Sequence, residues 1–462
     1  MLDSLIAKEV IDYGLKKGAD FIDLFVDQQQ FETLSVKSSE VDNISNGINF
    51  GIGIRLIYGT KVLYGYTNSK NKKDLLDVVD ALSVNEKVRQ DVEQSMSFNF
   101  EKNIDQHLVH YGLNNNLSLD EKIPFLFNVD QETRALSEKI SQVSASISQR
   151  SQEIEIFNSE GLHTSDTRNY IRLGVNAVAE DGNKREDSYY SPGAMMGFEF
   201  INSLDPKSIS ENIVKEALTK LDAIACPAGK MPVIIDNGFG GVIFHEACGH
   251  LLETTSVAKK ASVFHDKMGE KIASSKVSAV DDGTLGNYWG SINIDDEGMA
   301  TKKTQLIKDG ILTSFMVDKL GSMKTGYERT GSARRENYRY APTSRMRNTY
   351  IEAGTDKFDD MISSIDKGIY CKKMGGGSVS PGTGEFNFVA NESYLIENGK
   401  IKSCVKGASL IGTGPDTLTK ISMIADNLDF SAGVCGSVSG GVNTTVGQPA
   451  IKVDEILVGG GK

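Results

Sequence analysis

The chain has 462 residues, 39% apolar and 24% charged, with 50 basic against 62 acidic side chains and a net charge of −12. This is the composition of a globular protein with two or three domains, and its acidity argues against nucleic acid as a partner. No window is apolar enough to span a membrane, and the first residues lack the basic flank and apolar core of a signal peptide. The five scattered cysteines form no disulfide framework, so we expect a cytoplasmic protein without a membrane partner.

The first half of the chain has the pattern of an α/β (α+β) domain. Apolar residues recur at helical spacing in the segments 2–15, 71–92, 118–137 and 206–224. Between them, β-type runs separated by turn signals lie at 21–26, 31–36, 50–57, 61–66, 140–150, 153–157 and 170–179.

The sequence pattern changes from mixed helix and strand to short, glycine-rich strands at Cys226-Pro227-Ala228-Gly229, which breaks the last of these helices. Only 13 of the 46 glycines precede it. The following half alternates short apolar runs with turns such as Asp309-Gly310 and Asn398-Gly399, which are hairpin signals. We therefore predict an N-terminal domain at 1–226 and a β-rich, barrel-like, mostly antiparallel C-terminal domain at 227–462.

One segment gathers the side chains that metal chemistry needs, in the order His-Glu-Ala-Cys-Gly-His over residues 245–250. In the His-Glu-x-x-His motif the histidines are four residues apart, and both face one metal from one side of a helix. Here they are five apart, which places them about 140° apart around an ideal helix. Both can reach one ion only if the helix is bulged or ends between them, and Gly249 eases that distortion.

A catalytic zinc takes three protein ligands and keeps a position for water, so His245 and His250 need a third ligand. Cys248, Glu253 and the distant Cys435, which lies between glycines, are the candidates. Cysteine and histidine ligands favour Zn²⁺. Glu253 could instead orient the His250 ring, or be a surface carboxylate. The alternative for the histidines is a role as core side chains bonded to backbone carbonyls.

The chain resembles the TldD/PmbA family of zinc metallopeptidases, and in particular its catalytic TldD branch. The resemblance is carried by HEACGHLLE at 245–253 and by segments in the same order at 280–298, 331–351, 393–401, 405–414 and 434–460. The first half is similar more weakly, over 18–57.

This resemblance implies an HExxxH motif with a distant cysteine, in which His245, His250 and Cys435 bind Zn²⁺ and Glu246 activates a zinc-bound water. It implies unfolded or extended peptides as substrates, including precursor-peptide leaders and labile small proteins. It also implies a homodimer, or a heterodimer with a TldE/PmbA-like homologue that lacks the metal. Cys248 stands where an apolar residue is expected in relatives.

The alternative function is a peptide-binding or regulatory protein with a structural zinc, or one that needs a partner subunit for activity. A structural site has four protein ligands, and Cys248 would complete that set. Two further features have simple interpretations. The arginines between 334 and 347 are expected to form ion pairs within a strand or at a dimer contact. The acidic runs 281–282 and 295–297 are expected to be solvated turns.

Overall fold

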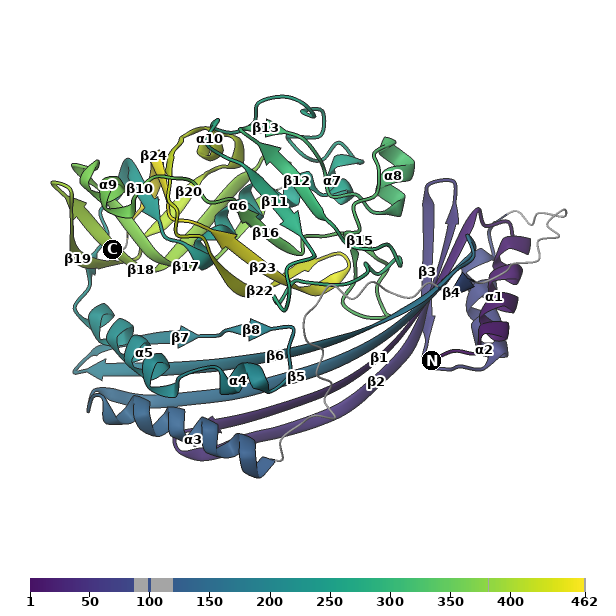
Figure 1. The fold of residues 1–462 in the computed structure, drawn as a ribbon, viewed down its shortest axis with the longest axis horizontal. Helices are drawn as coiled ribbons and strands as arrows, with labels where there is room; N and C mark the ends of the chain where they lie inside the picture. Colours follow the sequence, from purple (N-terminus) through teal and green to yellow (C-terminus); the bar gives the residue numbers. More distant parts are fainter. Residues whose placement is uncertain (87–98, 101–118, 381, 461–462) are drawn as a thin grey trace.

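The computed structural model describes residues 1–86, 99–100, 119–380 and 382–460 (Figure 1). The first half forms a curved eight-stranded sheet in the order β3-β2-β1-β5-β6-β4, with β7 and β8 both paired to β6. Its strands are β1 (Phe21–Lys37), β2 (Glu40–Tyr58), β3 (Lys61–Thr67), β4 (Asn99–Phe100), β5 (Ile140–Asn158), β6 (Leu162–Asp181), β7 (Lys184–Tyr190) and β8 (Gly193–Ala194).

The two β-type runs at 21–26 and 31–36 belong to one continuous strand, β1, so the prediction of two separate runs was wrong. Polar residues at 27–30 interrupt the apolar pattern, yet they pair with β2 and with β5 on both sides. Asp27 and Gln29 are buried there, and Gln152 of β5 donates a hydrogen bond to Asp27 at 3.0 Å. The runs at 140–150 and 153–157 are likewise one strand, β5.

Helices cover the two ends of this sheet (Figure 1). Helices α1 (Ser4–Lys16) and α2 (Lys72–Ser83) pack on one end, while α3 (Leu119–Ala135), α4 (Glu199–Asn202) and α5 (Pro206–Leu221) pack on the other. Carboxylate caps start two of them, because Asp3 and Asp205 each accept hydrogen bonds from two backbone N–H groups of the first turn. The predicted helical segments are found, although the end of 71–92 and the start of 118–137 lie partly outside the described residues.

The second half is rich in strands, as predicted. Five of them, in the order β17-β10-β24-β20-β18, close into a barrel through the pairing of β17 with β18. Strands β19, β9 and β21 extend this sheet at β18 and β24. The bounds are β9 (Ile224–Ala225), β10 (Gly229–Ile235), β17 (Lys367–Ser380), β18 (Glu385–Glu397), β19 (Lys400–Lys406), β20 (Ser409–Thr413), β21 (Ile421–Ile424) and β24 (Ile451–Gly459).

A second sheet of six strands packs beside the barrel in the order β13-β12-β11-β16-β23-β22, and β14 pairs with β15 separately. These strands are β11 (Ala279–Asp282), β12 (Lys303–Lys308), β13 (Ile311–Leu312), β14 (Ala333–Arg334), β15 (Thr343–Ser344), β16 (Asn348–Ile351), β22 (Asp429–Ser437) and β23 (Gly440–Gln448). The remaining helices are α8 (Lys319–Thr325), α9 (Phe358–Ser363), α10 (Gly414–Thr419) and the segments around the histidine motif described below. None of the described helices combines the length and apolarity needed to cross a membrane.

The acidic runs expected to be solvated turns are buried, which corrects that prediction. Asp281 and Arg347 are both fully buried and form an ion pair at 2.7 Å. Glu297 binds Arg55 of β2 at 2.7 Å, and Asp296 binds Arg168 of β6 at 2.7 Å.

These arginines neutralise carboxylates whose burial alone would be unfavourable. Because β2 and β6 belong to the first half of the chain, the last two pairs tie the curved sheet to the second half. The division into domains at 1–226 and 227–462 stays a prediction. At that boundary β9 pairs with β19 of the second half.

Candidate metal centre

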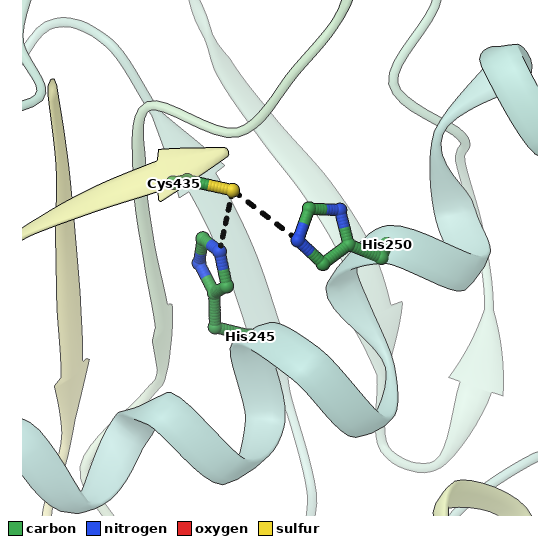
Figure 2. A group of neighbouring side chains, drawn as sticks. All are labelled: His245, His250 and Cys435. Carbon is green, nitrogen blue, oxygen red and sulfur yellow. Dashed lines mark hydrogen bonds between the residues drawn. The ribbon is translucent and has the colours of Figure 1, made fainter. Parts of the chain in front are cut away.

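The histidine motif lies where a helix ends. Strand β10 leads through a turn of 3₁₀ helix at Gly238–Gly241 into α6 (Val242–Ala247), and a second 3₁₀ turn follows at Gly249–Leu252. Cys248 leaves the helical conformation, with φ −133° and ψ −51°. The prediction that the helix is bulged or ends between the histidines is therefore confirmed in its second form, and the break brings His245 and His250 together (Figure 2).

Gly249 leaves room at this break for the side chain of Met346. A Cβ atom on Gly249 would lie 2.2 Å from the Sδ atom of the buried Met346. The close approach of the backbone to Met346 thus holds the second 3₁₀ turn, and with it His250, against the neighbouring sheet.

Cys435 reaches the histidines from β22, 185 residues after His250. Its Sγ atom lies 3.2 Å from Nε2 of His245 and 3.2 Å from Nε2 of His250 (Figure 2). The three potential ligand atoms are all within 4.8 Å of one another. We refer to these three residues as the His-His-Cys group.

The electrostatics of this group favour a thiolate. Burial alone would raise the pKa of the Cys435 thiol, but the adjacent imidazoles of His245 and His250 lower it to about 3. Burial alone would lower the pKa of His250, but the carboxylate of Glu253 and the sulfur of Cys435 hold it well above its usual range. Two nitrogens and one thiolate sulfur around a common point are a donor set suited to zinc.

The dimensions of the His-His-Cys group fit a metal ion. Zinc–nitrogen and zinc–sulfur bonds of about 2.0 and 2.3 Å at a tetrahedral angle separate the two ligand atoms by about 3.5 Å. The observed separation of 3.2 Å between sulfur and each nitrogen needs only a small displacement to reach that value. Three protein donors leave one position for a water or a substrate atom.

Glu253 and Arg345 surround the group with further contacts. The carboxylate of Glu253 is buried, and its Oε2 lies 3.1 Å from Nδ1 of His250. The guanidinium of Arg345, also fully buried, donates hydrogen bonds to the carbonyl of Cys435, to Ser439 Oγ at 2.9 Å and to the carbonyl of Gly440 at 3.0 Å. Arg345 therefore holds the end of β22 that carries the thiol.

In the sequence Arg345 is one of five closely spaced arginines, and their pattern does not predict this contact. Arg345 and Arg347 lie beside carboxylates, and Arg334 and Arg335 donate to backbone carbonyls, whereas the exposed Arg339 contacts Tyr338. Among these arginines, only Arg345 reaches the His-His-Cys group in the described structure. The high density of arginines in an otherwise acidic chain was the only sequence feature that pointed to a role for this segment. It could not separate Arg345 from Arg347, which binds Asp281 instead.

Glu246 and Cys248 occupy different surroundings. The Oε2 atom of Glu246 lies 3.7 Å from Nε2 of His250, and the side chain keeps some contact with solvent. Cys248 is fully buried in the apolar core of the second half, where burial raises the pKa of its thiol. Among the described residues, the structure does not bring Cys248 to the His-His-Cys group.

Comparisons with known proteins identify the family to which the chain is similar over most of its length. Residues 228–460 match the PmbA/TldA metallopeptidase C-terminal domain, residues 113–221 the central domain and residues 22–85 domain 1. A Haemophilus influenzae protein named metalloprotease TldD homolog is 38% identical over 460 residues, covering 98% of this chain and 95% of that protein. A Saccharolobus solfataricus protein named zinc metalloprotease TldD homolog is 27% identical over 449 residues, covering 96% and 95%.

The fold is shared with a solved structure as well. TldE from Thermococcus kodakarensis superposes with a TM-score of 0.77 at 19% sequence identity, covering 98% of this chain and 99% of that one. The family models and the 38% identical relative define the class as metallopeptidase. The chain belongs to the PmbA/TldD metallopeptidase family, which confirms the resemblance found in the sequence.

Proposed function

We propose that the chain is a zinc-dependent peptidase in which His245, His250 and Cys435 hold Zn²⁺ and Glu246 is the catalytic base. The observation that carries the proposal is the convergence of three donor atoms within 4.8 Å beside a partly exposed carboxylate. Zinc bound there supplies Lewis acidity, which acidifies water and polarises a carbonyl group.

The protein groups then have separate tasks. Glu246 takes a proton from the attacking water and delivers it to the leaving amine, which its position 3.7 Å from His250 Nε2 permits. Glu253 accepts a hydrogen bond from Nδ1 of His250, so that Nε2 is left as the metal-binding nitrogen. Arg345 positions the backbone of Cys435.

We propose unfolded or extended peptides as substrates, including precursor-peptide leaders and labile small proteins. Strand β22, which carries Cys435, is the last strand of its sheet and pairs with β23 on one side only. An edge strand offers backbone N–H and C=O groups to an added extended chain, whatever its side chains. A folded protein would have to unfold locally to bind in this way.

We further propose that the chain works as a dimer, either with itself or with a TldE/PmbA-like homologue. The likeness of its fold to TldE supports a partner of the same architecture. The alternative function, a binding protein with a structural zinc, needs a fourth protein ligand. Within the described residues the His-His-Cys group has no fourth histidine, cysteine or carboxylate member, which favours the catalytic interpretation.

The test compares wild type with Glu246→Gln, both loaded to the same zinc content, on a mixture of unfolded peptides analysed by mass spectrometry. We expect cleavage by wild type and a loss of at least 100-fold in the variant. If wild type and variant cut equally, Glu246 is not the base. If zinc-loaded wild type cuts nothing, alone or mixed with a TldE-like homologue, the chain is a binding protein.

A further inference from the structure

A groove of about 500 Å³ lies between β22 and the part of the curved sheet formed by β6, β7 and β8. Aromatic side chains supply most of its walls. Seven of its lining residues are aromatic, among them Tyr189, Tyr190, Tyr288, Trp289 and Phe430. Such a surface suits apolar side chains of a ligand, and its tyrosine hydroxyls suit the ligand's polar groups.

One end of the groove lies at the residue that precedes Cys435 in β22. Residues 429–434 of β22 form one wall, so the last of them, Val434, is directly bonded to Cys435. The indole Nε1 of Trp289 donates a hydrogen bond to the carbonyl of Gly433 at 2.9 Å, which fixes the ring against the strand. The groove thus comes within one residue of Cys435 along β22, although the three members of the His-His-Cys group do not themselves line it.

Arg172, on β6, is a cation in this groove without a carboxylate partner. Its Nε donates to Ser191 Oγ at 2.8 Å, and its guanidinium lies 5.6 Å from the centre of the Trp289 ring. Within the described part of the chain, no carboxylate lies within 4.0 Å of it. The other groove cation, Lys373, is neutralised by Glu216 at 2.7 Å.

The geometry of Arg172 leaves its two terminal nitrogens available. The bond from Nε to Ser191 and the contact with Trp289 fix the plane of the guanidinium, and no described acceptor bonds to Nη1 or Nη2. Partial burial lowers the pKa of Arg172 but leaves it charged at neutral pH, because an arginine starts from a value far above it. A fixed, charged fork of this kind binds a carboxylate through two parallel hydrogen bonds.

We propose that this groove is a substrate subsite in which Arg172 binds a carboxylate of the peptide while neighbouring side chains pack on the aromatic walls. The inference rests on the proposed peptidase function and deepens it, since it names the substrate class. The preferred peptides are apolar or aromatic chains that carry one carboxylate, from an aspartate or glutamate side chain or from a free C-terminus, near the bond that is cut.

The structure also limits the distance between that carboxylate and the bond. Arg172 is linked to Cys435 through Trp289, Gly433 and one further residue of β22. These steps span at most about 18 Å, which an extended chain covers in roughly five residues at 3.3 Å each. A carboxylate farther than this from the scissile bond gains nothing from Arg172.

The experiment uses zinc-loaded full-length protein and unstructured dodecapeptides of one apolar sequence. In one series a single position carries either Asp or Asn, and the position moves along the peptide. In the other series the neutral peptide ends in a free acid or in an amide. Cut sites and kcat/KM are measured by mass spectrometry, and binding to Glu246→Gln is measured by calorimetry.

We expect about tenfold higher kcat/KM and tighter binding for peptides with a carboxylate within five residues of the cut. Arg172→Gln should remove the preference, so that charged and neutral peptides are cut with the same kcat/KM, and Arg172→Lys should restore part of it. Arg150→Gln is the matched control, because Arg150 stacks on Tyr170 at 4.9 Å but does not line the groove, and it should keep the full preference.

The outcomes separate the two proposals. If only the Asp series shows the preference, Arg172 binds internal acidic side chains, and if only the free acids show it, Arg172 binds the C-terminus. Equal cleavage and binding of charged and neutral peptides by wild type overturn this inference and leave the peptidase intact. If no peptide is cut but binding still depends on the carboxylate, the proposed peptidase function is overturned, while the groove keeps its role as a carboxylate-binding site.

Discussion

One buried carboxylate, Glu253, lies between His250 and Arg345. Its Oε2 is 3.1 Å from Nδ1 of His250, and its Oε1 is 4.0 Å from Nε of Arg345. Arg345 in turn donates to the backbone carbonyl of Cys435. The ion pair between Glu253 and Arg345 thus links His250 to Cys435, which are 185 residues apart in the sequence.

Replacing Glu253 should weaken metal binding without unfolding the protein. In Glu253→Gln the charge that stabilises the His250 ring is lost, and partners of this kind typically contribute 10- to 100-fold to metal affinity. Zinc affinity measured by competition with a chelator should fall by that factor. The exposed Glu270→Gln is the control and should bind zinc as wild type does. Equal affinities for all three proteins would remove Glu253 from the site.

Arg345 and Arg347 offer a matched pair of fully buried arginines with different partners. Arg345→Lys cannot keep all three contacts near Cys435, so the thiolate should shift relative to the histidines. In cobalt-substituted protein this should change the thiolate charge-transfer absorption.

Arg347→Lys disturbs the pair with Asp281 and should lower stability while it leaves that absorption unchanged. An altered spectrum in both variants would mean that the change is transmitted through the fold generally.

The two cysteines nearest the site should behave oppositely. Cys435→Ser removes the sulfur on which both histidines converge, so zinc content after extensive dialysis should fall to a small fraction of wild type. Cys248→Ala removes a neutral thiol from the apolar core and should retain zinc. Loss of zinc in Cys248→Ala, with an unchanged unfolding transition, would support the four-ligand structural site instead.

Gly249→Ala should destabilise the helix break. The new Cβ would lie 2.2 Å from Sδ of Met346, and overpacking of a buried contact costs about 1–3 kcal/mol. Urea unfolding should show a decrease of this size in the free energy of unfolding. A second substitution, Met346→Ala, creates space for the methyl group. The loss of unfolding free energy caused by Met346→Ala should therefore be smaller in the Gly249→Ala protein than in wild type. Additive costs would show that the two residues do not clash.

The carboxyl of Asp318 should give the protein a measurable pH dependence. Burial, together with the nearby charge of Glu297, raises the pKa of Asp318 to about 6. The folded protein therefore keeps this proton between pH 4 and 6 while the unfolded chain has released it, so this contribution to stability is full at low pH and is lost as pH rises through about 6.

The stability of Asp318→Asn should match wild type near pH 4 and exceed it at pH 7 by up to about 3 kcal/mol. The amide oxygen can still accept the hydrogen bonds that Thr254 and Gly321 donate to Oδ1, so the cap of α8 is kept. Denaturant unfolding of both proteins across this pH range makes the comparison. Parallel curves would contradict the raised pKa.

Local patterns in the sequence predicted much of the architecture. Helical spacing placed α1 and α5, and glycine-containing turns placed the hairpins of the second half. The length of β1 could not be predicted, because Asp27 in its polar middle accepts hydrogen bonds from the Gln152 side chain of β5 and from the backbone N–H of Tyr338, both of which come much later in the chain.

The candidate site could be predicted only where it depends on local sequence patterns. The two histidines and the break between them follow from spacing within six residues, whereas the pairing with Cys435 depends on a contact across 185 residues and was implied only by the family resemblance. The burial of Asp281 and of the run 295–297 was missed, because an acidic run looks the same whether water or a distant arginine neutralises it. Arg172 was missed because a single arginine in a strand carries no pattern.

The long separation between His250 and Cys435 also has a consequence during protein synthesis. At about 5–20 residues per second, a ribosome needs roughly 10–40 s to add the 185 residues between them. Throughout that time the nascent chain carries both imidazoles and Glu246 but no thiolate to complete the set. The proposed active centre therefore cannot assemble while the chain that forms it is still unfolded and being synthesised.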